Sequence, residues 1–395
     1  MRYAISILLT LAGHAADWPQ WRGPNRDGKS TETGLLKEWP AGGPKLIWKT
    51  QGLGAGYASL SVVQGRIYTL GQHDETQFIM ALDAATGKKL WETPNGGAYH
   101  ERRGDGPRGA PTIEGDRLWA MTADGTVSCL DIKTGKKIWS QSSVKDYGGS
   151  VPNWGYSESP LIDGERLIFV TGGSGSAIVA IDKSTGKLVW KSQGDHAAYS
   201  SAMIADTGRI RQVLAFTSRG AVGVRADNGE LLWRYDRIAN RTANIATPIF
   251  HNGHAFFSSD YGTGCVLLKL DAGGKADEVY FNGEMKNHYS TSVLVDDHLY
   301  GYSSAILTAM KFMTGEVAWK NRSVGKGSVI YADGHLYANG ENGTVGLIEA
   351  TPAGYKEKSR FSYSKGDLPT WAVPAISNGH LYIRDQDTLY AHAIQ

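Results

Sequence analysis

Apolar and polar residues alternate in short segments along most of this chain, which is the pattern of half-buried β-strands. In residues 110–119, Ala110-Pro111 is followed by Thr112-Ile113, a Glu-Gly turn and a second alternating segment. Such a segment predicts a hairpin of two short strands. Eight copies begin with the pairs Ser61-Val62, Ala110-Pro111, Ser159-Pro160, Ser201-Ala202, Thr247-Pro248, Ser292-Val293, Ser328-Val329 and Val373-Pro374.

A second phrase recurs between these hairpins. It is clearest in residues 82–91, where Leu-Asp-Ala-Ala-Thr-Gly is followed by Lys-Lys-Leu-Trp. Close copies end at Trp139 and Trp190, and looser copies end at Trp233 and Trp319. Asp and Thr side chains bond to turn backbone and Gly adopts the left-handed conformation, so the phrase predicts a turn between two strands.

The two phrases together predict four strands in each repeat. The outermost strand carries Trp48, Trp91, Trp139, Trp190, Trp233 and Trp319, with Tyr280 and Phe361 in the same place in two degenerate repeats. A period of roughly 45 residues with four strands is typical of propeller blades. The final strand pattern, residues 389–394, lacks a following Trp strand, and Leu46-Ile47-Trp48-Lys49 lacks three preceding strands. We therefore expect an all-β fold, an eight-bladed β-propeller of four-stranded antiparallel blades over residues 44–395. We expect the N-terminal strand to complete its last blade.

The residues before the propeller have a different pattern. Residues 1–15 combine an early Arg, an apolar run and small residues near Ala15, which predicts a cleavable signal peptide and a periplasmic or secreted protein. The alternative is an uncleaved membrane anchor. Residues 16–43, which contain Trp18 and Trp21, are expected to clasp the propeller, because exposed Trp pairs are costly on a soluble monomer. No later segment is apolar enough for a membrane span.

Charge and cysteine content narrow the function classes. Lys and Arg number 41 and Asp and Glu number 39, so nothing indicates nucleic-acid binding. The two cysteines, Cys129 and Cys265, fall in distant repeats and are expected to be buried thiols. Four histidines share one repeat position, His254, His298, His335 and His380, and we expect no metal site there.

The phrase Leu-Asp-x-x-Thr-Gly-x-x-x-Trp resembles the repeat of pyrroloquinoline quinone (PQQ)-type propellers, a family that includes quinoprotein alcohol dehydrogenases and BamB. The resemblance covers roughly Pro44–Gln395, and Asp17–Gly28 is similar to the opening of exported BamB-like propellers. For the quinoproteins it implies PQQ on the propeller axis, a disulfide ring of adjacent cysteines, Ca²⁺ held by Glu and Asn, and an Asp base. Here Cys129 and Cys265 are not adjacent, and no Cys-x-x-Cys-His motif for haem occurs.

Residues just before each innermost strand line the mouth of the axial channel in a propeller. We predict a ligand site from Tyr57, Arg108, Tyr156, Glu158, His196, Tyr199, Asn244, His288, Tyr289, Lys326 and Trp371, with Ser59 and Thr247 beside them. Polar groups that converge between aromatic walls describe a ligand pocket. The alternative is that these side chains bond to one another in a plugged channel. The loops 100–108 and 145–154 are expected to lie over the mouth.

Three functions follow from these patterns. The first is a non-catalytic binding or scaffold module of the cell envelope, with an envelope protein, a glycan or a small molecule as partner. The alternative is a quinoprotein-like oxidoreductase that binds PQQ and Ca²⁺ at the axis. The resemblance implies this because the places of Arg108, Glu158 and Asn244 carry cofactor contacts in quinoproteins. The third is a polysaccharide hydrolase or lyase that uses Glu158, His196 or His288. No Gly-x-Ser-x-Gly, phosphate-binding Gly-rich or His-Glu-x-x-His motif occurs.

Overall fold

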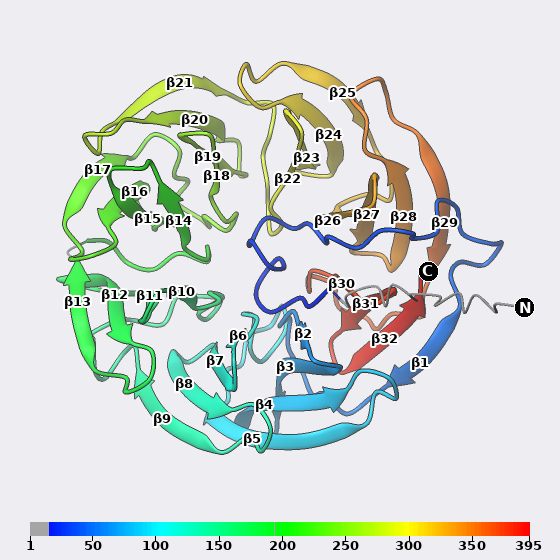
Figure 1. Ribbon diagram of the computed structural model, residues 1–395, viewed down its shortest axis with the longest axis horizontal. Coiled ribbons are helices and arrows are strands. Elements are labelled where there is room, and N and C mark those ends of the chain that lie inside the picture. The colour runs from blue at the N-terminus through cyan, green and yellow to red at the C-terminus, as the bar shows by residue number, and fades with distance from the viewer. Residues whose placement is uncertain (1–15, 193) are drawn as a thin grey trace, which may run out of the picture.

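The computed structural model describes residues 16–192 and 194–395, so the predicted signal peptide, residues 1–15, lies outside the described residues. Every regular element within these ranges is a β-strand, and the strands form eight four-stranded antiparallel sheets. The sheets are arranged around a central axis as the blades of a propeller (Figure 1). The eight-bladed all-β prediction is therefore confirmed.

The chain forms the blades in order. Blades one to four contain β2 (Ser61–Val63), β3 (Arg66–His73), β4 (Thr76–Asp83), β5 (Lys89–Gly97); β6 (Thr112–Glu114), β7 (Arg117–Met121), β8 (Thr126–Asp131), β9 (Lys137–Ser142); β10 (Leu161–Asp163), β11 (Arg166–Gly173), β12 (Ser176–Asp182), β13 (Leu188–Ser192); and β14 (Met203–Asp206), β15 (Arg211–Phe216), β16 (Ala221–Arg225), β17 (Leu231–Tyr235). Blades five to eight contain β18 (Ile249–His251), β19 (His254–Ser259), β20 (Gly264–Leu270), β21 (Ala276–Asn282); β22 (Val293–Val295), β23 (His298–Ser303), β24 (Ile306–Lys311), β25 (Val317–Asn321); β26 (Gly327–Ala332), β27 (His335–Gly340), β28 (Thr344–Glu349), β29 (Glu357–Ser362); and β30 (Ala375–Ser377), β31 (His380–Asp385), β32 (Thr388–Ala393) with β1 (Leu46–Thr50).

The ring closes where the two ends of the propeller meet. Strand β1 pairs with β32 in antiparallel register, with Trp48 opposite Ala391, as the sequence predicted. Buried Arg384 of β31 donates to Thr69 Oγ1 in β3 at 2.7 Å, so a charged hydrogen bond joins the last blade to the first. Without β1, strand β32 would be the outer edge of a three-stranded blade, so the pairing completes that blade and covers its edge.

The repeated aromatic residue of each outer strand ties its blade to the next one. The ring nitrogen of Trp91, for example, donates to the Ile132 carbonyl of the following blade at 3.1 Å. The same contact joins Trp48 to Ala84, Trp139 to Lys183, Trp190 to Ala226, Trp319 to Thr351 and, through its hydroxyl, Tyr280 to Phe312. Trp233 differs, because it donates to Gln212 of its own blade.

The Asp-x-x-Thr-Gly turn has its role at the same blade interface. Asp83 Oδ1 accepts hydrogen bonds from the Thr86 backbone and hydroxyl, at 2.8 and 2.7 Å. Gly87 has a φ of +70°, and a Cβ there would lie 2.7 Å from the Trp48 ring of the preceding blade. The motif therefore specifies both a turn and a flat surface on which the neighbouring Trp packs.

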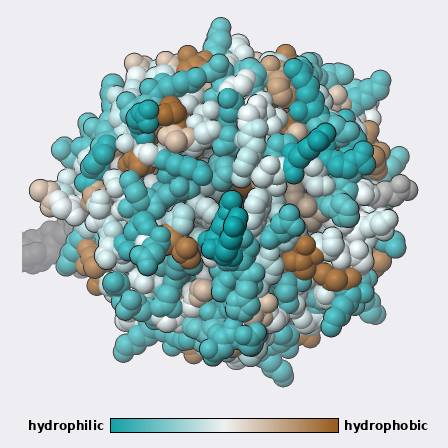
Figure 2. Space-filling view, turned by 180° about the vertical axis from the view of Figure 1, so that it is seen from behind, coloured by the Kyte–Doolittle hydropathy of each residue, from teal (hydrophilic) through white to brown (hydrophobic). Residues whose placement is uncertain are grey.

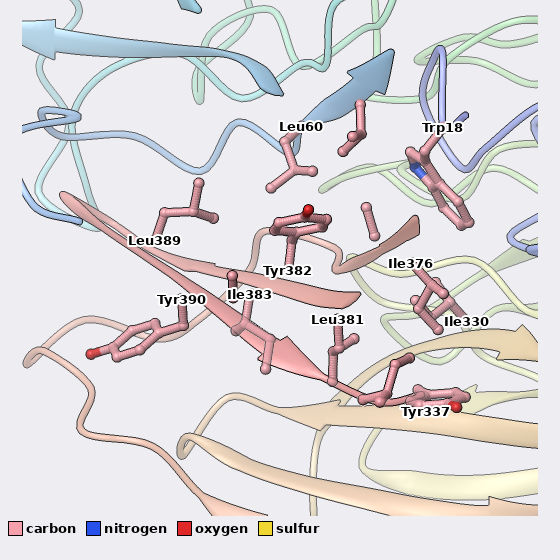
Figure 3. Packing of buried hydrophobic residues seen from close by; sticks show 14 of the residues in the cluster. Trp18, Leu60, Ile330, Tyr337, Ile376, Leu381, Tyr382, Ile383, Leu389 and Tyr390 are labelled. Carbon is pink, nitrogen blue, oxygen red and sulfur yellow. The ribbon is translucent and has the colours of Figure 1, made fainter. Parts of the chain in front are cut away.

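Residues 16–43 lie across the ring, from its centre to β29 at the rim (Figure 1). Trp18 exchanges two backbone hydrogen bonds with Val62 of β2, at 2.7 and 2.8 Å, and is 2% exposed. Its ring belongs to a cluster that includes Leu60, Ile330, Tyr337 and the last blade (Figure 3). Further along, Trp39 packs edge-on against Phe361 at a centroid distance of 5.2 Å and so covers blade seven, where Phe361 stands in place of the repeat Trp.

Cys129 and Cys265 are both buried and free, as expected. No helix within the described residues is long and apolar enough to cross a membrane. The face opposite to that of Figure 1 is mainly hydrophilic, and its hydrophobic residues are scattered (Figure 2).

Candidate functional site

An open pocket of about 860 Å³, its mouth included, lies where the loops before the innermost strands converge. All blades except the seventh contribute to it, and Trp21 of the N-terminal segment completes it. Its lining residues are Trp21, Tyr57, Ser59, Glu101, Arg103, Arg108, Trp154, Ser157, Tyr199, Ser201, Ile245, Thr247, Tyr261, His288, Tyr289 and Trp371. We call this space the axial pocket.

One wall of the axial pocket is a continuous arc of rings. Tyr57 lies 4.8 Å from Trp371, Trp371 lies 5.9 Å from Tyr289, and His288 lies 5.2 Å from Tyr261 between ring centroids. His288 and Tyr289 are themselves 6.0 Å apart. Successive rings in the first three pairs are tilted by about 40° (38°, 38° and 43°), so the wall is curved.

The facing wall combines aromatic rings with arginines. Trp154 and Tyr199 lie 5.4 Å apart, and the Arg103 guanidinium lies 5.3 Å from the Trp154 ring centroid. Arg108 donates to the Gly104 and Gly106 carbonyls and stacks over Tyr99 at 5.1 Å. Arg108 therefore holds the loop 100–108 in shape, whereas the Arg103 charge faces the pocket.

The floor of the axial pocket comes from the N-terminal segment. Trp21 is half-buried, and its ring nitrogen donates to Thr247 Oγ1 at 2.9 Å. The next residue, Arg22, is 2% exposed and donates to the Thr291 and Ser292 carbonyls of blade six, at 2.8 and 2.7 Å. Arg22 thus anchors the floor to the ring.

A buried acid and a buried arginine lie beside this anchor. Arg26, which is 3% exposed, donates to the Ser159 carbonyl at 2.8 Å and the Pro160 carbonyl at 3.2 Å. Glu158 accepts a hydrogen bond from the Val170 backbone through one oxygen, and its other oxygen has no protein partner. Burial raises the pKa of Glu158 to about 8, although the Val170 bond and the Arg26 charge oppose the shift. The carboxyl is therefore mostly neutral at pH 7.

Among the described residues, His288 is the one histidine that lines the axial pocket. Its Nε2 and the Tyr261 hydroxyl lie 2.9 Å apart. Burial and the charge of Lys326 lower the pKa of His288 to about 4, so the ring is neutral at pH 7. It contributes a polar edge to the aromatic wall, rather than a positive charge.

The structure brings six of the eleven predicted site residues into the axial pocket: Tyr57, Arg108, Tyr199, His288, Tyr289 and Trp371. Tyr156 is buried outside it and donates to the Thr171 carbonyl at 2.7 Å. Lys326 lies behind Tyr289, 5.6 Å from its ring centroid, and pairs with Glu341 at 3.4 Å. Glu158 lies beside Arg26 and outside the axial pocket lining.

The two remaining predicted residues, His196 and Asn244, line a second cavity of about 740 Å³. It adjoins the axial pocket, because Tyr199 lines both cavities, and we call it the side cavity. Its walls are loop residues 150–153, 196–199, 218 and 240–244. Asn244 uses its amide within the fold: it donates to the Thr217 carbonyl at 3.0 Å and accepts from the Ser259 hydroxyl at 2.9 Å.

Five pocket residues lie outside the sequence-based list and its flanking loops: Trp21, Ser157, Ser201, Ile245 and Tyr261. Trp21 was assigned only to the clasp, and Tyr261 lies in the turn between β19 and β20. Tyr261 has a φ of +54°, which is rare for a bulky side chain. Nothing in the sequence around Tyr261 indicates this conformation. Glu101, Arg103 and Trp154 belong to the two loops expected over the channel mouth.

The residues present do not fit the PQQ and Ca²⁺ site that the resemblance implies. A calcium ion needs converging charged or carbonyl oxygens, but Glu158 is buried with a raised pKa and Asn244 is bonded to backbone and Ser259. Within the described ranges, no group of three or more His, Cys, Asp or Glu side chains is placed to hold a metal. Cys129 and Cys265 lie in different blades, so the disulfide ring has no counterpart.

Known proteins share this architecture at low sequence identity. PedH, a quinoprotein alcohol dehydrogenase of Pseudomonas putida, is 25% identical over 306 residues, which cover 71% of this chain and 46% of PedH. BamB of Yersinia pestis is 20% identical over 318 residues, which cover 76% of each chain. This chain therefore spans less than half of PedH, and it spans 17% of the quinohemoprotein alcohol dehydrogenase ADH IIB of Pseudomonas putida.

Solved structures show the same fold. BamB from Moraxella catarrhalis superposes with a TM-score of 0.64 at 14% identity, covering 88% of this chain and 99% of that one. The quinohemoprotein alcohol dehydrogenase of Comamonas testosteroni superposes with a TM-score of 0.70 at 13% identity, covering 96% and 80%. A family model described as outer membrane protein assembly factor BamB matches residues 39–150 and 75–321. With more than half of its length matched and an eight-bladed ring in common, this chain belongs to that BamB family of PQQ-type propellers.

Proposed function

We propose that this protein is a non-catalytic binding module of the cell envelope, which holds a ligand or a segment of a partner in the axial pocket. The observation that carries this proposal is an open aromatic pocket at which three ionisable groups are neutral or held inside the fold. Arg108 is bound to loop carbonyls, His288 is neutral, and Glu158 is buried beside Arg26. Such a site offers contact surface without a paired acid and base.

Family membership supports the envelope location. Relatives from Yersinia pestis and Shewanella oneidensis are named outer membrane protein assembly factors. The export signal that the sequence predicts in residues 1–15 is consistent with this proposed location. We carry over from these relatives a scaffold role with an envelope protein as partner. A glycan as the alternative partner and a monomeric state are part of our own proposal.

The oxidoreductase alternative comes from relatives named quinoprotein alcohol dehydrogenases. Sequence similarity does not choose between the two groups of relatives. The choice depends on the oxygen atoms that could bind Ca²⁺, since Asn244 is bonded inside the fold and Glu158 is buried outside the axial pocket lining.

The test measures binding and turnover on the same samples. The purified protein is screened by thermal shift against glycans, envelope metabolites, and PQQ with Ca²⁺, and bound compounds are recovered and identified by mass spectrometry. Trp154→Ala removes one ring from the pocket wall, and Trp154→Phe retains an aromatic face as the matched control. We expect a compound that raises Tm, loses this effect in Trp154→Ala, retains it in Trp154→Phe and is recovered unchanged.

Two results would contradict the proposal. One is chemical conversion of the bound compound. The other is reduction of an electron acceptor that requires both PQQ and Ca²⁺, which would establish the oxidoreductase instead.

A further inference from the structure

The axial pocket adjoins the side cavity, which lies among the loops of blades three to five, and we call the two spaces together the cleft. Tyr199 lines both spaces, and its backbone N–H donates to the Asn244 carbonyl at 3.0 Å. Asn153 lines the side cavity and Trp154 lines the axial pocket, so one loop forms the boundary. Tyr99 holds this loop by donating to the Asn153 carbonyl at 2.7 Å. A ligand longer than one ring can therefore extend from the axis into the side cavity.

The geometry of the aromatic walls favours one kind of ligand ring. The faces of aromatic side chains carry partial negative charge and attract C–H groups. Four neighbouring ring pairs of the axial pocket are tilted by about 40° (38°, 38°, 43°, and 40° for Trp154 and Tyr199), and His288 meets Tyr289 edge-on at 84°. This arrangement makes a curved wall instead of a parallel slot. A puckered sugar ring, with C–H groups on its faces, matches a curved wall better than a flat aromatic ligand does.

The excess of positive charge in the cleft favours an acidic ligand. Arg103 and Arg108 line the axial pocket and Arg241 lines the side cavity, whereas Glu101 is the lining carboxylate within the described chain. Arg108 donates to loop carbonyls through both terminal nitrogens of its guanidinium, so these donors are already used inside the fold. Arg103 stacks on Trp154, and Arg241 is exposed. These two guanidinium groups remain available for carboxylates at separate points of the cleft.

We propose that this cleft binds an acidic oligosaccharide of at least two sugar rings. One ring packs on the aromatic wall beside Arg103, and the chain continues past Tyr199 to Arg241. The inference rests on the proposed binding function and names the class of ligand.

The experiment is a calorimetric titration of the purified protein at low salt. The probes are digalacturonate, tetragalacturonate and neutral cellotetraose, with Arg103→Ala, Arg241→Ala and the control Arg209→Ala. Arg209 is exposed in the turn between β14 and β15 and lines neither cavity. The Arg103 backbone carbonyl that holds Tyr57 is retained in Arg103→Ala.

We expect tetragalacturonate to bind about tenfold more tightly than either the dimer or the neutral tetramer, since one charge-assisted contact has about this effect. Arg103→Ala removes the preference for the acidic chain, and Arg241→Ala removes the advantage of the tetramer over the dimer. Arg209→Ala leaves all three affinities unchanged. Equal binding of the neutral tetramer, or equal binding of the dimer, overturns the inference.

Failure of this inference is distinguishable from failure of the proposed function. If no uronate binds but another compound shows Trp154-dependent binding, the ligand class is wrong and the binding module stands. If tetragalacturonate binds as expected and is cleaved, the ligand class stands and the non-catalytic function is wrong. If no compound of any class binds, both are wrong.

Discussion

The rim and the axis of this propeller are built by different means. At the rim, the same Trp-to-carbonyl bond joins neighbouring blades at several places, and the same Asp-Thr-Gly turn recurs. At the axis, every blade presents different residues, and the N-terminal segment adds buried Arg22 and Arg26 to them. The rim therefore divides its stability among repeated contacts, whereas the axis concentrates it in single residues.

The largest effect is expected at Arg22. Arg22→Ala removes charged hydrogen bonds to the Thr291 and Ser292 carbonyls and leaves both without this donor inside the fold. We expect the free energy of unfolding to fall by about 4 kcal/mol. Urea denaturation measures the loss, with exposed Arg102→Ala as the control. A similar small loss in both variants would show that the N-terminal segment does not anchor the ring.

The pH dependence of stability is expected to identify the buried acid at the axis. The folded pKa of Glu158, about 8, lies above the ordinary value near 4.5, so its stabilising contribution is complete below about pH 4.5 and is lost as the pH rises through 8. Between pH 5 and 8 this group should lower the free energy of unfolding by about 3 kcal/mol. Glu158→Gln should flatten that part of the profile measured by urea denaturation. An unchanged slope in the variant would contradict the neutral buried acid.

A smaller effect is expected for one Trp at the rim. Trp190→Phe keeps most of the ring but removes the bond to the Ala226 carbonyl, which is 3.0 Å in length and buried. We expect the free energy of unfolding, measured by urea denaturation, to fall by about 1–2 kcal/mol, because one hydrogen bond is lost and the ring is retained. Phe361 shows that a Phe can occupy this place, as it does in blade seven. Trp190→Ala, which also removes the ring, serves as the comparison and should lose about 3 kcal/mol. Equal losses in the two variants would contradict an important role for the packed ring.

The smallest effect is expected at a single turn. Asp131 accepts bonds from Lys133 and Thr134, and those from Thr134 do most to lower its pKa. Its contribution is present above the ordinary Asp pKa and is lost as the pH falls through the lowered value. Asp131→Ala should therefore cost under about 1 kcal/mol at pH 7, with a smaller difference from the unmodified chain near pH 3. A loss as large as that of Arg22→Ala would show that the rim does not distribute its stability.

The regular part of the molecule was predictable because its causes are local. Strand alternation, the Asp-Thr-Gly turn and the spacing of the Trp residues act within about ten residues, and they repeat often enough to reveal blade number and closure. The candidate site was only partly predictable. Tyr57, His288 and Trp371 were identified from their places before inner strands, but Asn244 and Tyr156 occupy similar places and are committed to contacts inside the fold.

By itself, the sequence determined the eight blades, the outer Trp strands and the joining of β1 to the last blade, because each depends on a repeated local pattern. Only the tertiary structure decided which side chains meet at the axis. Trp21 and Thr247 are 226 residues apart along the chain, yet they bond across the pocket floor. Such contacts depend on where the closed ring places each loop and on how the N-terminal segment crosses it, and no local pattern encodes either position.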